Sequence, residues 1–240
     1  MSTALLLAAG KATRLGALRE RYAKACVPVG GTTPLAFLLE ALARGGFTAV
    51  RINTHYRAQQ VRAVAEASAP AGLALHFHHE PDILGTGGTL LALAEAGQAV
   101  DAVVNAKMFT DLPFARLRDA APGTLFLHPP SPLATFGGFR YDDAHRVRGL
   151  LGRDEALPVG EQAAVFIGVC RPHPRWLDHL REARRRDPEG VLCLVRHGLL
   201  PHLEEAPDHA AALLHPGTWC EISTPERVAA AEALARALQA

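Results

Sequence analysis

Short apolar segments alternate with amphipathic helical segments through the first 105 residues. The first, Ala4–Ala8, is apolar throughout and is soon followed by Gly10, as is typical of a parallel strand buried on both faces. Further strands are predicted at Thr48–Asn53, Leu73–His78 and Ala102–Asn105. The alternation predicts an α/β fold with three layers: a mostly parallel Rossmann-like sheet with helices on both faces.

The helices begin at recognisable signals. Thr33-Pro34 and Thr224-Pro225 each place an N-cap threonine before a proline at the first helical position. Other helical patterns cover Gln59–Glu66, Leu90–Ala94 and Trp176–Arg184, and Glu80–Gly88 is rich in turn residues. After about residue 120, strands are predicted at Thr124–His128, Phe136–Tyr141 and Ala164–Val169. We expect these later strands to form a small antiparallel extension within a single domain, because no long linker interrupts the chain.

Composition excludes several classes of partner. Lys and Arg total 25 against 24 Asp and Glu, so no basic field favours nucleic acid. The longest apolar run, Ala4–Ala9, is too short to span a bilayer, and no basic region precedes it as in a signal peptide. The four scattered cysteines resemble reduced thiols. We therefore expect a cytoplasmic protein without membrane contact, as a monomer or homodimer.

Three loops at predicted strand ends carry small and charged residues. They are Ala8–Leu15, Leu84–Gly88 and Asn105–Asp111. In open α/β sheets, ligands bind beyond the carboxyl ends of the strands, and small residues let backbone amides approach a phosphate or base closely. Arg14 and Lys24 bring positive charge to the same end of the sheet. Each loop is weak evidence alone, but three on successive strands predict a ligand site.

At these motifs the chain resembles the sugar-1-phosphate nucleotidyltransferases, also called nucleotide-sugar pyrophosphorylases. It is most similar to their short, single-domain type, which includes N-acetylmuramate-1-phosphate uridylyltransferases and mannose-1-phosphate guanylyltransferase-like proteins. The family's opening L-A-A-G-x-G-T-R-L resembles Leu7–Leu15, its L-x-T-G-G resembles Leu84–Gly88, and its N-G-D-x-x-T-D resembles Asn105–Asp111. The family's V-P-V-x-G-x-P-L and W-x-D-I-G-T-P-E-R resemble Val27–Leu35 and Trp219–Arg227. The resemblance covers nearly the whole chain.

The resemblance implies a reaction between a nucleoside triphosphate (UTP, GTP or dTTP) and a sugar 1-phosphate, giving an NDP-sugar and pyrophosphate. It implies a nucleotide-binding half at 1–120, a sugar-binding half at 121–223 and a C-terminal helix at 224–240. Arg14 would meet the β- and γ-phosphates, and Lys24 would lie against the α-phosphate. The residues implied in nucleotide binding are Leu7, Ala8, Ala9, Gly10, Lys11, Thr13, Gly85, Thr86, Gly87 and Gly88. Those implied in sugar binding are Asn105, Gly138, Glu161 and Gly168.

The chain departs from the family at its metal site. Lys107 occupies the position of an aspartate that binds Mg²⁺, and Glu221 occupies that of a second carboxylate. A lysine about 4 Å from a divalent cation would be repelled by about 8 kcal/mol at an effective dielectric near 20. We therefore expect that Mg²⁺ does not bind in the usual way, that Lys107 pairs with Glu221, and that Asp111 or the substrate phosphates would hold any displaced ion.

Two hypotheses follow from this departure. In the first, the chain is an enzyme in which Lys107 acts catalytically beside Arg14 and Lys24, neutralising charge at the α-phosphate in place of the metal. In the second, it is a pseudoenzyme that binds nucleotide or sugar phosphate as a regulatory module. The retained Arg14, which would serve the leaving pyrophosphate, favours the enzyme.

Two smaller predictions concern local structure. Ala23 and Ala25 stand where the family has prolines beside the catalytic lysine, so we expect a looser loop there. His76, His78 and His79 form an H-x-H-H pattern, which is more typical of an edge strand than of a zinc site because no further ligands are evident nearby.

Overall fold

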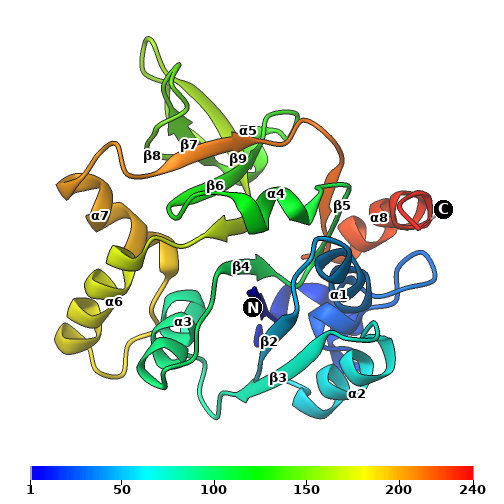
Figure 1. Ribbon diagram of the computed structural model, residues 1–240. Helices are drawn as coiled ribbons and strands as arrows, with labels where there is room; N and C mark the ends of the chain where they lie inside the picture. Colours follow the sequence, from blue (N-terminus) through cyan, green and yellow to red (C-terminus); the bar gives the residue numbers. More distant parts are fainter. Residues whose placement is uncertain (1, 240) are drawn as a thin grey trace. The chain divides into compact units, whose positions relative to one another are not determined.

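The computed structural model describes residues 2–239, which form two compact units (Figure 1). The first unit comprises the described residues of Met1–Ile83, Val103–Asp119 and Gly217–Ala240, and the second comprises Leu84–Ala102 and Ala120–Pro216. The expected halves divide the chain near residue 120, whereas the structure groups residues 84–102 with the second unit. The number of functional domains stays a prediction.

The strands of the first unit follow the order β4-β1-β2-β3, and β1, β2 and β3 run parallel to one another. Their bounds are β1 Thr3–Leu7, β2 Ala49–Thr54, β3 Ala74–His79 and β4 Ala102–Asn105. β1 pairs with β2 in parallel from Thr3 opposite Ala49 to Leu7 opposite Asn53. β1 is almost wholly buried and β3 alternates between exposed and half-buried residues, so the histidines of β3 lie on an edge strand, as expected.

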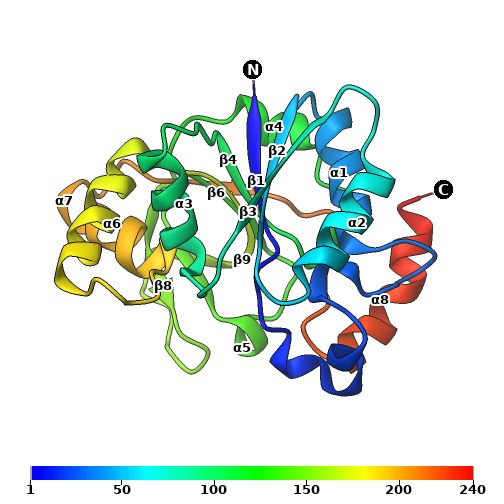
Figure 2. The same cartoon turned by 90° about the horizontal axis from the view of Figure 1, so that it is seen from below.

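Helices cover this sheet. α1 (Pro34–Arg44) and α2 (Ala58–Ser68) lie side by side against the strands, as both ribbon views show (Figures 1 and 2). The Thr33 hydroxyl accepts a hydrogen bond from the Ala36 amide at 3.2 Å, and Thr224 caps α8 (Pro225–Ala237) in the same way. Both predicted N-caps are therefore confirmed. The unit also contains α4 (Phe114–Asp119) and the 3₁₀ segments η1 (Thr13–Glu20) and η2 (Lys24–Cys26).

A short antiparallel pair completes the first unit. β5 (Met108–Thr110) pairs with β11 (Trp219–Glu221), with Met108 opposite Glu221 and Thr110 opposite Trp219. Strands of three residues leave almost no periodic signal, so the sequence did not predict them. This pairing places the loop after β4 beside the segment that leads into α8.

The second unit is mixed. β6 (Thr124–His128) lies between β10 (Ala211–Leu214), which is parallel to it, and β9 (Gln162–Arg171), which is antiparallel. β7 (Gly138–Tyr141) pairs with β8 (Val147–Leu151) and β9. The helices are α3 (Gly85–Glu95), α5 (Leu133–Phe136), α6 (Pro174–Arg186), the π-helical η3 (Leu194–Leu199) and α7 (Leu200–Glu205).

The predicted class is confirmed: a mostly parallel sheet with flanking helices and a small antiparallel addition. Two local predictions are wrong. Gly85–Gly88 form the first turn of α3 instead of a turn-rich loop, and the strand expected from Phe136 begins at Gly138 because Phe136 ends a helical turn. None of the helices described between residues 2 and 239 combines the length and hydrophobicity needed to cross a membrane.

Candidate functional site

The loop that follows β1 is fixed by a buried side chain from β2. The Oδ1 atom of Asn53 accepts hydrogen bonds from the amides of Ala8 at 2.6 Å and Ala9 at 3.3 Å. Its Nδ2 group donates to the Glu80 carboxylate at 2.8 Å, and both side chains are buried. The sequence indicated only that β2 ends in Asn53 and not in an acid. The structure shows that this amide holds the start of the predicted nucleotide loop.

We expect Asn53→Ala to lower the free energy of unfolding by about 3 kcal/mol, because it removes the acceptor of two buried amides and a donor to the buried Glu80 carboxylate. For a chain of this length, that corresponds to a melting temperature lower by about 6–12 °C. Thermal denaturation measures the effect. Gln59→Ala, an amide removed from an exposed position on α2, is the matched control, and equal melting temperatures for the two variants would contradict the role of Asn53.

Most of the remaining loop residues are open to solvent. A Cβ built on Gly10 would meet no atom within 4 Å, and Lys11, Thr13 and Arg14 are exposed. Ala12 is buried and takes a left-handed backbone conformation with φ of 56°, which is uncommon for a residue other than glycine. The predicted nucleotide-binding residues Leu7–Gly10, Lys11 and Thr13 are thus contiguous at the end of β1, with space beside Gly10.

The segment that carries Lys24 is held from α2. The Ala23 amide donates to Oε1 of Gln60 at 2.6 Å, and Nε2 of Gln60 donates to the Arg21 carbonyl at 3.0 Å. Proline has no amide hydrogen, so a proline at position 23 would lose the first bond. Ala23 and Ala25 are both buried. The expectation of a looser loop is therefore wrong here: a side-chain hydrogen bond takes the place of a rigid ring.

Four cations of the first unit act on one another. Burial, then the charge of Lys107, then that of Arg14 lower the pKa of Lys24 to about 8. Burial, then Arg14, then Arg227 lower the pKa of Lys107 to about 8. We call Arg14, Lys24, Lys107 and Arg227 the cation cluster. The structure therefore brings together all three predicted catalytic residues, and it adds Arg227, which the sequence placed only in a motif.

One carboxylate faces this cluster. Glu221 is buried; its Oε2 atom lies 3.2 Å from Nζ of Lys107, and its Oε1 atom forms an ion pair with Arg227. Ser223 donates its hydroxyl hydrogen to Glu221, and Lys107 also donates to that hydroxyl oxygen at 3.3 Å. The predicted Lys107–Glu221 pair is confirmed. Within residues 2–239, the side chain of Lys24 makes no hydrogen bond or ion pair, so positive charge exceeds negative charge in the cluster.

This donor set does not fit Mg²⁺, which binds through oxygen ligands and keeps an octahedral shell. Both oxygens of the Glu221 carboxylate are engaged by cations, and the ammonium of Lys107 stands where a second anionic ligand would be. Glu221 is therefore not free to act as a metal ligand in this arrangement.

Asp111, the other predicted metal ligand, lies apart from Glu221. Asp111 accepts a hydrogen bond from the Thr218 amide at 2.7 Å, whereas Glu221 is opposite Met108 in the β5–β11 pair. Asp111 is three residues beyond Met108, the residue opposite Glu221. Three residues of strand span about 10 Å, and an odd separation places two side chains on opposite faces of the strand. The two carboxylates are thus not brought together.

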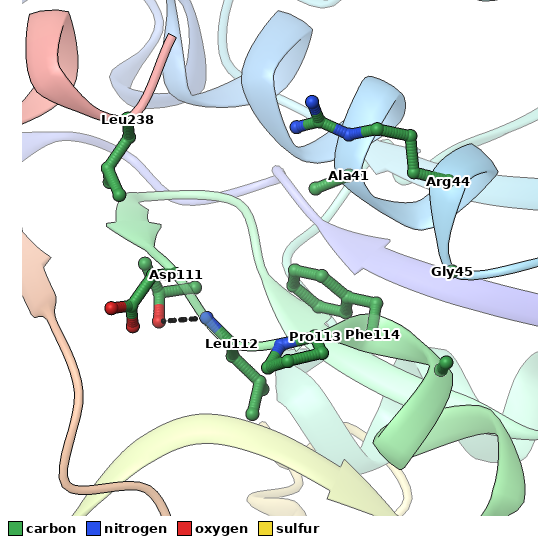
Figure 3. Close-up of a pocket in the computed structure, with 10 residues that line it drawn as sticks. Ala41, Arg44, Gly45, Asp111, Leu112, Pro113, Phe114 and Leu238 are labelled. Carbon is green, nitrogen blue, oxygen red and sulfur yellow. Dashed lines mark hydrogen bonds between the residues drawn. The ribbon is translucent and has the colours of Figure 1, made fainter. Parts of the chain in front are cut away.

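Asp111 instead lines a separate cavity of about 360 Å³ (Figure 3). The Leu112 amide donates to the Thr110 hydroxyl at 3.1 Å, and Figure 3 shows Leu112 beside Asp111. Arg44 and Gly45 at the end of α1 line the same cavity, and none of the residues of the cation cluster does.

The predicted glycine motif belongs to the second unit, where packing explains its composition. A Cβ on Gly85 would lie 2.4 Å from the Leu192 carbonyl oxygen, and one on Gly87 would lie 2.5 Å from Leu180. The Gly87 amide donates to the Leu192 carbonyl at 2.8 Å, and the Thr86 hydroxyl accepts from the Leu194 amide at 2.9 Å. A role of Gly85, Thr86, Gly87 and Gly88 with the base stays a prediction.

The predicted sugar-binding residues belong to both units. Asn105 ends β4 and its carbonyl accepts a hydrogen bond from the Lys107 amide at 2.9 Å. In the second unit, Glu161 forms an ion pair with Arg140, Gly138 packs against the Ala164 carbonyl, and Gly168 has a positive φ of 78° within β9. Their role with a sugar stays a prediction.

Three curated relatives are similar in sequence. N-acetylmuramate alpha-1-phosphate uridylyltransferase of Neisseria meningitidis is 25% identical over 98% of this chain and 98% of its own length. Mannose-1-phosphate guanylyltransferase of Mycobacterium tuberculosis is 29% identical over 93% of this chain and 61% of its length. Mannose-1-phosphate guanyltransferase of Debaryomyces hansenii is 30% identical over 48% of this chain, which spans only 33% of that protein.

The fold is shared with solved structures of HddC from Yersinia pseudotuberculosis. One matches with a TM-score of 0.74 and 17% identity, covering 98% of this chain and 99% of that one. A second, complexed with GMP-PN, has a TM-score of 0.72 with the same coverage. A family model described as the MobA-like NTP transferase domain matches residues 4–121. This match covers just under half of the chain, which is therefore similar to MobA-like NTP transferase domains over these residues.

Proposed function

We propose that this protein is a sugar-1-phosphate nucleotidyltransferase in which lysine supplies the charge that the family resemblance assigns to Mg²⁺. The observation that carries the proposal is the cation cluster: two lysines with pKa values lowered to about 8, two arginines and one carboxylate. Partly buried charges of one sign with too few counter-ions are costly and are typical of sites that bind the opposite charge. A triphosphate is an anion of the right kind for this cluster.

In the proposed reaction, an oxygen of the sugar 1-phosphate attacks the α-phosphorus of the nucleoside triphosphate. A new P–O bond forms, the bond to the β-phosphate oxygen breaks, and pyrophosphate leaves with that electron pair. Phosphoryl-type transfers depend chiefly on positioning and on neutralisation of charge. Lys24 and Lys107 would neutralise the α-phosphate, and Arg14 would stabilise the departing pyrophosphate. Glu221 and Ser223 would hold the Lys107 ammonium in position.

A second candidate is a nucleotide-binding module without turnover. The ion pairs of Glu221 favour it, because they satisfy the carboxylate that would otherwise be free for a metal. The relatives named above as uridylyltransferase and guanylyltransferases, together with the retained Arg14, favour the enzyme.

Pyrophosphate release separates the two candidates. UTP, GTP and dTTP are each incubated with a panel of sugar 1-phosphates, once with Mg²⁺ and once with EDTA. We expect release of pyrophosphate for at least one pair of substrates, persisting in EDTA. Nucleotide binding by calorimetry without any release would support the binding module and overturn the enzyme. Neither binding nor release would overturn both.

Nucleotide affinity should depend on pH above 8. Below pH 8, Lys24 and Lys107 are charged, and above it they lose their protons in the free protein. Bound phosphate raises their pKa values, so binding takes up protons and the affinity falls as pH rises through 8, by up to about tenfold per pH unit for each lysine. Calorimetry between pH 7 and 10 measures this. An affinity that stays constant across this range would contradict the placement of the two lysines at the phosphates.

A further inference from the structure

Three histidines from distant parts of the sequence meet in the second unit. His173 is the N-cap of α6, His202 lies in α7, and His209 lies just before β10. The ring centroid of His202 is 4.8 Å from that of His173 and 5.4 Å from that of His209, and the third separation is 5.7 Å. Each ring offers one nitrogen within 4.8 Å of the others.

His202 is the unusual member of this group. Its side chain is only 3% exposed, and neither ring nitrogen has a hydrogen-bond partner among the described residues. Buried polar groups in folded proteins are almost always satisfied, so a buried imidazole with two unpartnered nitrogens needs an explanation. A bound metal ion, which accepts the lone pair of a ring nitrogen, would explain this burial.

Two of the three rings, His202 and His173, are suited to this role in their charge state. Burial, followed by the neighbouring histidines, lowers the pKa of His202, while Glu205 raises it. Burial, then His209 and Arg175, lowers the pKa of His173. Neutral imidazole is the form that binds metals, so these two rings are ready to bind at neutral pH. The Nδ1 atom of His173 accepts a hydrogen bond from the Arg175 amide at 3.2 Å; binding through Nε2 would place the ring proton on Nδ1 and replace that bond.

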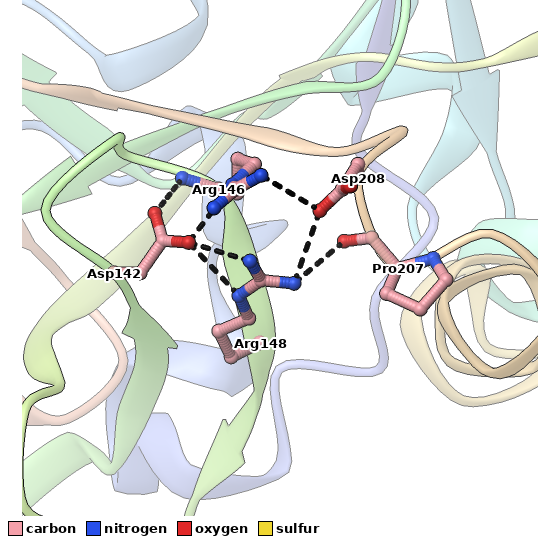
Figure 4. Close-up of polar contacts among 5 residues, drawn as sticks. All are labelled: Asp142, Arg146, Arg148, Pro207 and Asp208. Atoms are coloured by element: carbon pink, nitrogen blue, oxygen red, sulfur yellow. Dashed lines mark hydrogen bonds and ion pairs between the residues drawn. The ribbon is translucent and has the colours of Figure 1, made fainter.

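The segment that carries His209 is anchored by ion pairs (Figure 4). The carboxylate of Asp208 lies 3.3 Å from Arg146 and 3.2 Å from Arg148, and both arginines also bind Asp142. The His209 amide also donates to the Ala206 carbonyl at 3.1 Å. These contacts hold the backbone at His209 before any ligand binds.

We propose that His173, His202 and His209 form a site for a divalent transition-metal ion of the zinc class. Three imidazole nitrogens and one water complete the tetrahedral set that zinc prefers, with N–N separations of about 3.4 Å for Zn–N bonds near 2.1 Å. Small side-chain rotations close the present separations of up to 4.8 Å. The bound ion cross-links α6, α7 and the segment before β10, and this site is separate from the cation cluster.

A second group shares the central ring. His179, His202 and Glu205 also offer three ligand atoms within 4.8 Å, and the side chain of Glu205 is 71% exposed. We favour the first group because it presents three nitrogens and because an exposed carboxylate is readily solvated by water. The experiment below distinguishes the two.

The test uses tag-free protein stripped with chelator, because a polyhistidine tag would itself bind metal. Calorimetry with Zn²⁺ should show one site per chain, and Co²⁺ should give the visible absorption of a tetrahedral complex. At a zinc concentration about 100 times Kd, the melting temperature should rise by about 5–10 °C. Absence of a saturable site would overturn the proposal.

Variants identify the ligands. His209→Ala removes an exposed ring, and His173→Asn removes a ligand while keeping a good N-cap; each should weaken zinc binding by more than tenfold. Glu205→Gln and the exposed edge-strand change His76→Ala should leave the affinity unchanged. Loss of binding in Glu205→Gln with full binding in His209→Ala would overturn the proposed ligand set in favour of the second group.

Discussion

Replacing Lys24 by methionine is expected to lower kcat/KM for nucleotidyl transfer by about 10²–10³ while making the free protein more stable. The loss follows from removing one charge at the α-phosphate, an effect of the size found when a single preorganised charge-stabilising group is deleted. The gain in stability follows because Lys24 is half-buried among other cations. Burial and the charges of Lys107 and Arg14 lower the pKa of Lys24 to about 8. Relief of about 1 kcal/mol corresponds to a melting temperature higher by about 2–4 °C.

Opposite effects on activity and stability distinguish a functional charge from a structural one. A lysine that merely stabilised the fold would lower both quantities when replaced. Arg236→Met is the matched control, because it removes a cation from an exposed i,i+4 pair on α8. Arg236→Met should change neither kcat/KM nor the melting temperature measurably. Lys24→Arg should retain more activity than Lys24→Met. Thermal denaturation and the pyrophosphate assay provide the two readouts, and a lower melting temperature in Lys24→Met would contradict the interpretation.

The chain contains only three lysines, at positions 11, 24 and 107, which allows a direct measurement. Isotope-labelled lysine gives three ammonium signals in NMR spectra. Two of these should titrate near pH 8 in the free protein, as the pKa values of Lys24 and Lys107 require. Both should move to higher pH when nucleotide binds.

The sequence predicted the sheet of the first unit well because local signals there agree. Ala4–Ala8 is apolar throughout, and Thr33-Pro34 and Thr224-Pro225 mark helix starts by their own chemistry. Strands β5 and β11 were missed because a strand of three residues is too short to show a periodic hydrophobic pattern. Their pairing also joins positions more than 100 residues apart. Gly85–Gly88 were predicted as a turn because glycine frequency is a local statistic, whereas close packing against Leu192 and Leu194 decides their helical state.

The residues of the candidate site were likewise predicted where a local signal marks them, and missed where only a contact between distant positions does. Charge reversal at position 107 predicted the pair with Glu221, because two opposite charges replace a metal and its ligand. The contributions of Asn53 and Gln60 could not be predicted, since each bonds a backbone amide about 40 residues away. The three histidines of the second unit were missed for the same reason. His76 and His78 form a recognisable pattern because they are close in sequence, whereas the group around His202 is brought together only by the fold.

Replacing Lys107 by aspartate is expected to make charge neutralisation at the α-phosphate depend on Mg²⁺ instead of on the lysine ammonium. In the wild-type protein, Lys107 and Arg227 satisfy Glu221, and turnover should persist in EDTA. In Lys107→Asp, two carboxylates would lie close together, their repulsion would be relieved by a divalent cation, and the site would offer the oxygen ligands that Mg²⁺ prefers. We expect activity in EDTA to fall by more than about 10², as for removal of a charge-stabilising group, and Mg²⁺ to restore it at least in part.

Lys107→Met separates loss of the lysine from gain of the carboxylate. It should be as inactive in EDTA as Lys107→Asp, and Mg²⁺ should not rescue it, because Glu221 alone remains and Arg227 still pairs with it. Pyrophosphate release across a Mg²⁺ titration provides the measurement, and melting curves in the same titration report binding of the ion independently of turnover. Equal rescue of both variants by Mg²⁺ would show that the metal acts elsewhere on the nucleotide. It would remove Lys107 from the role of the missing cation, while leaving Lys24 and Arg14 at the phosphates.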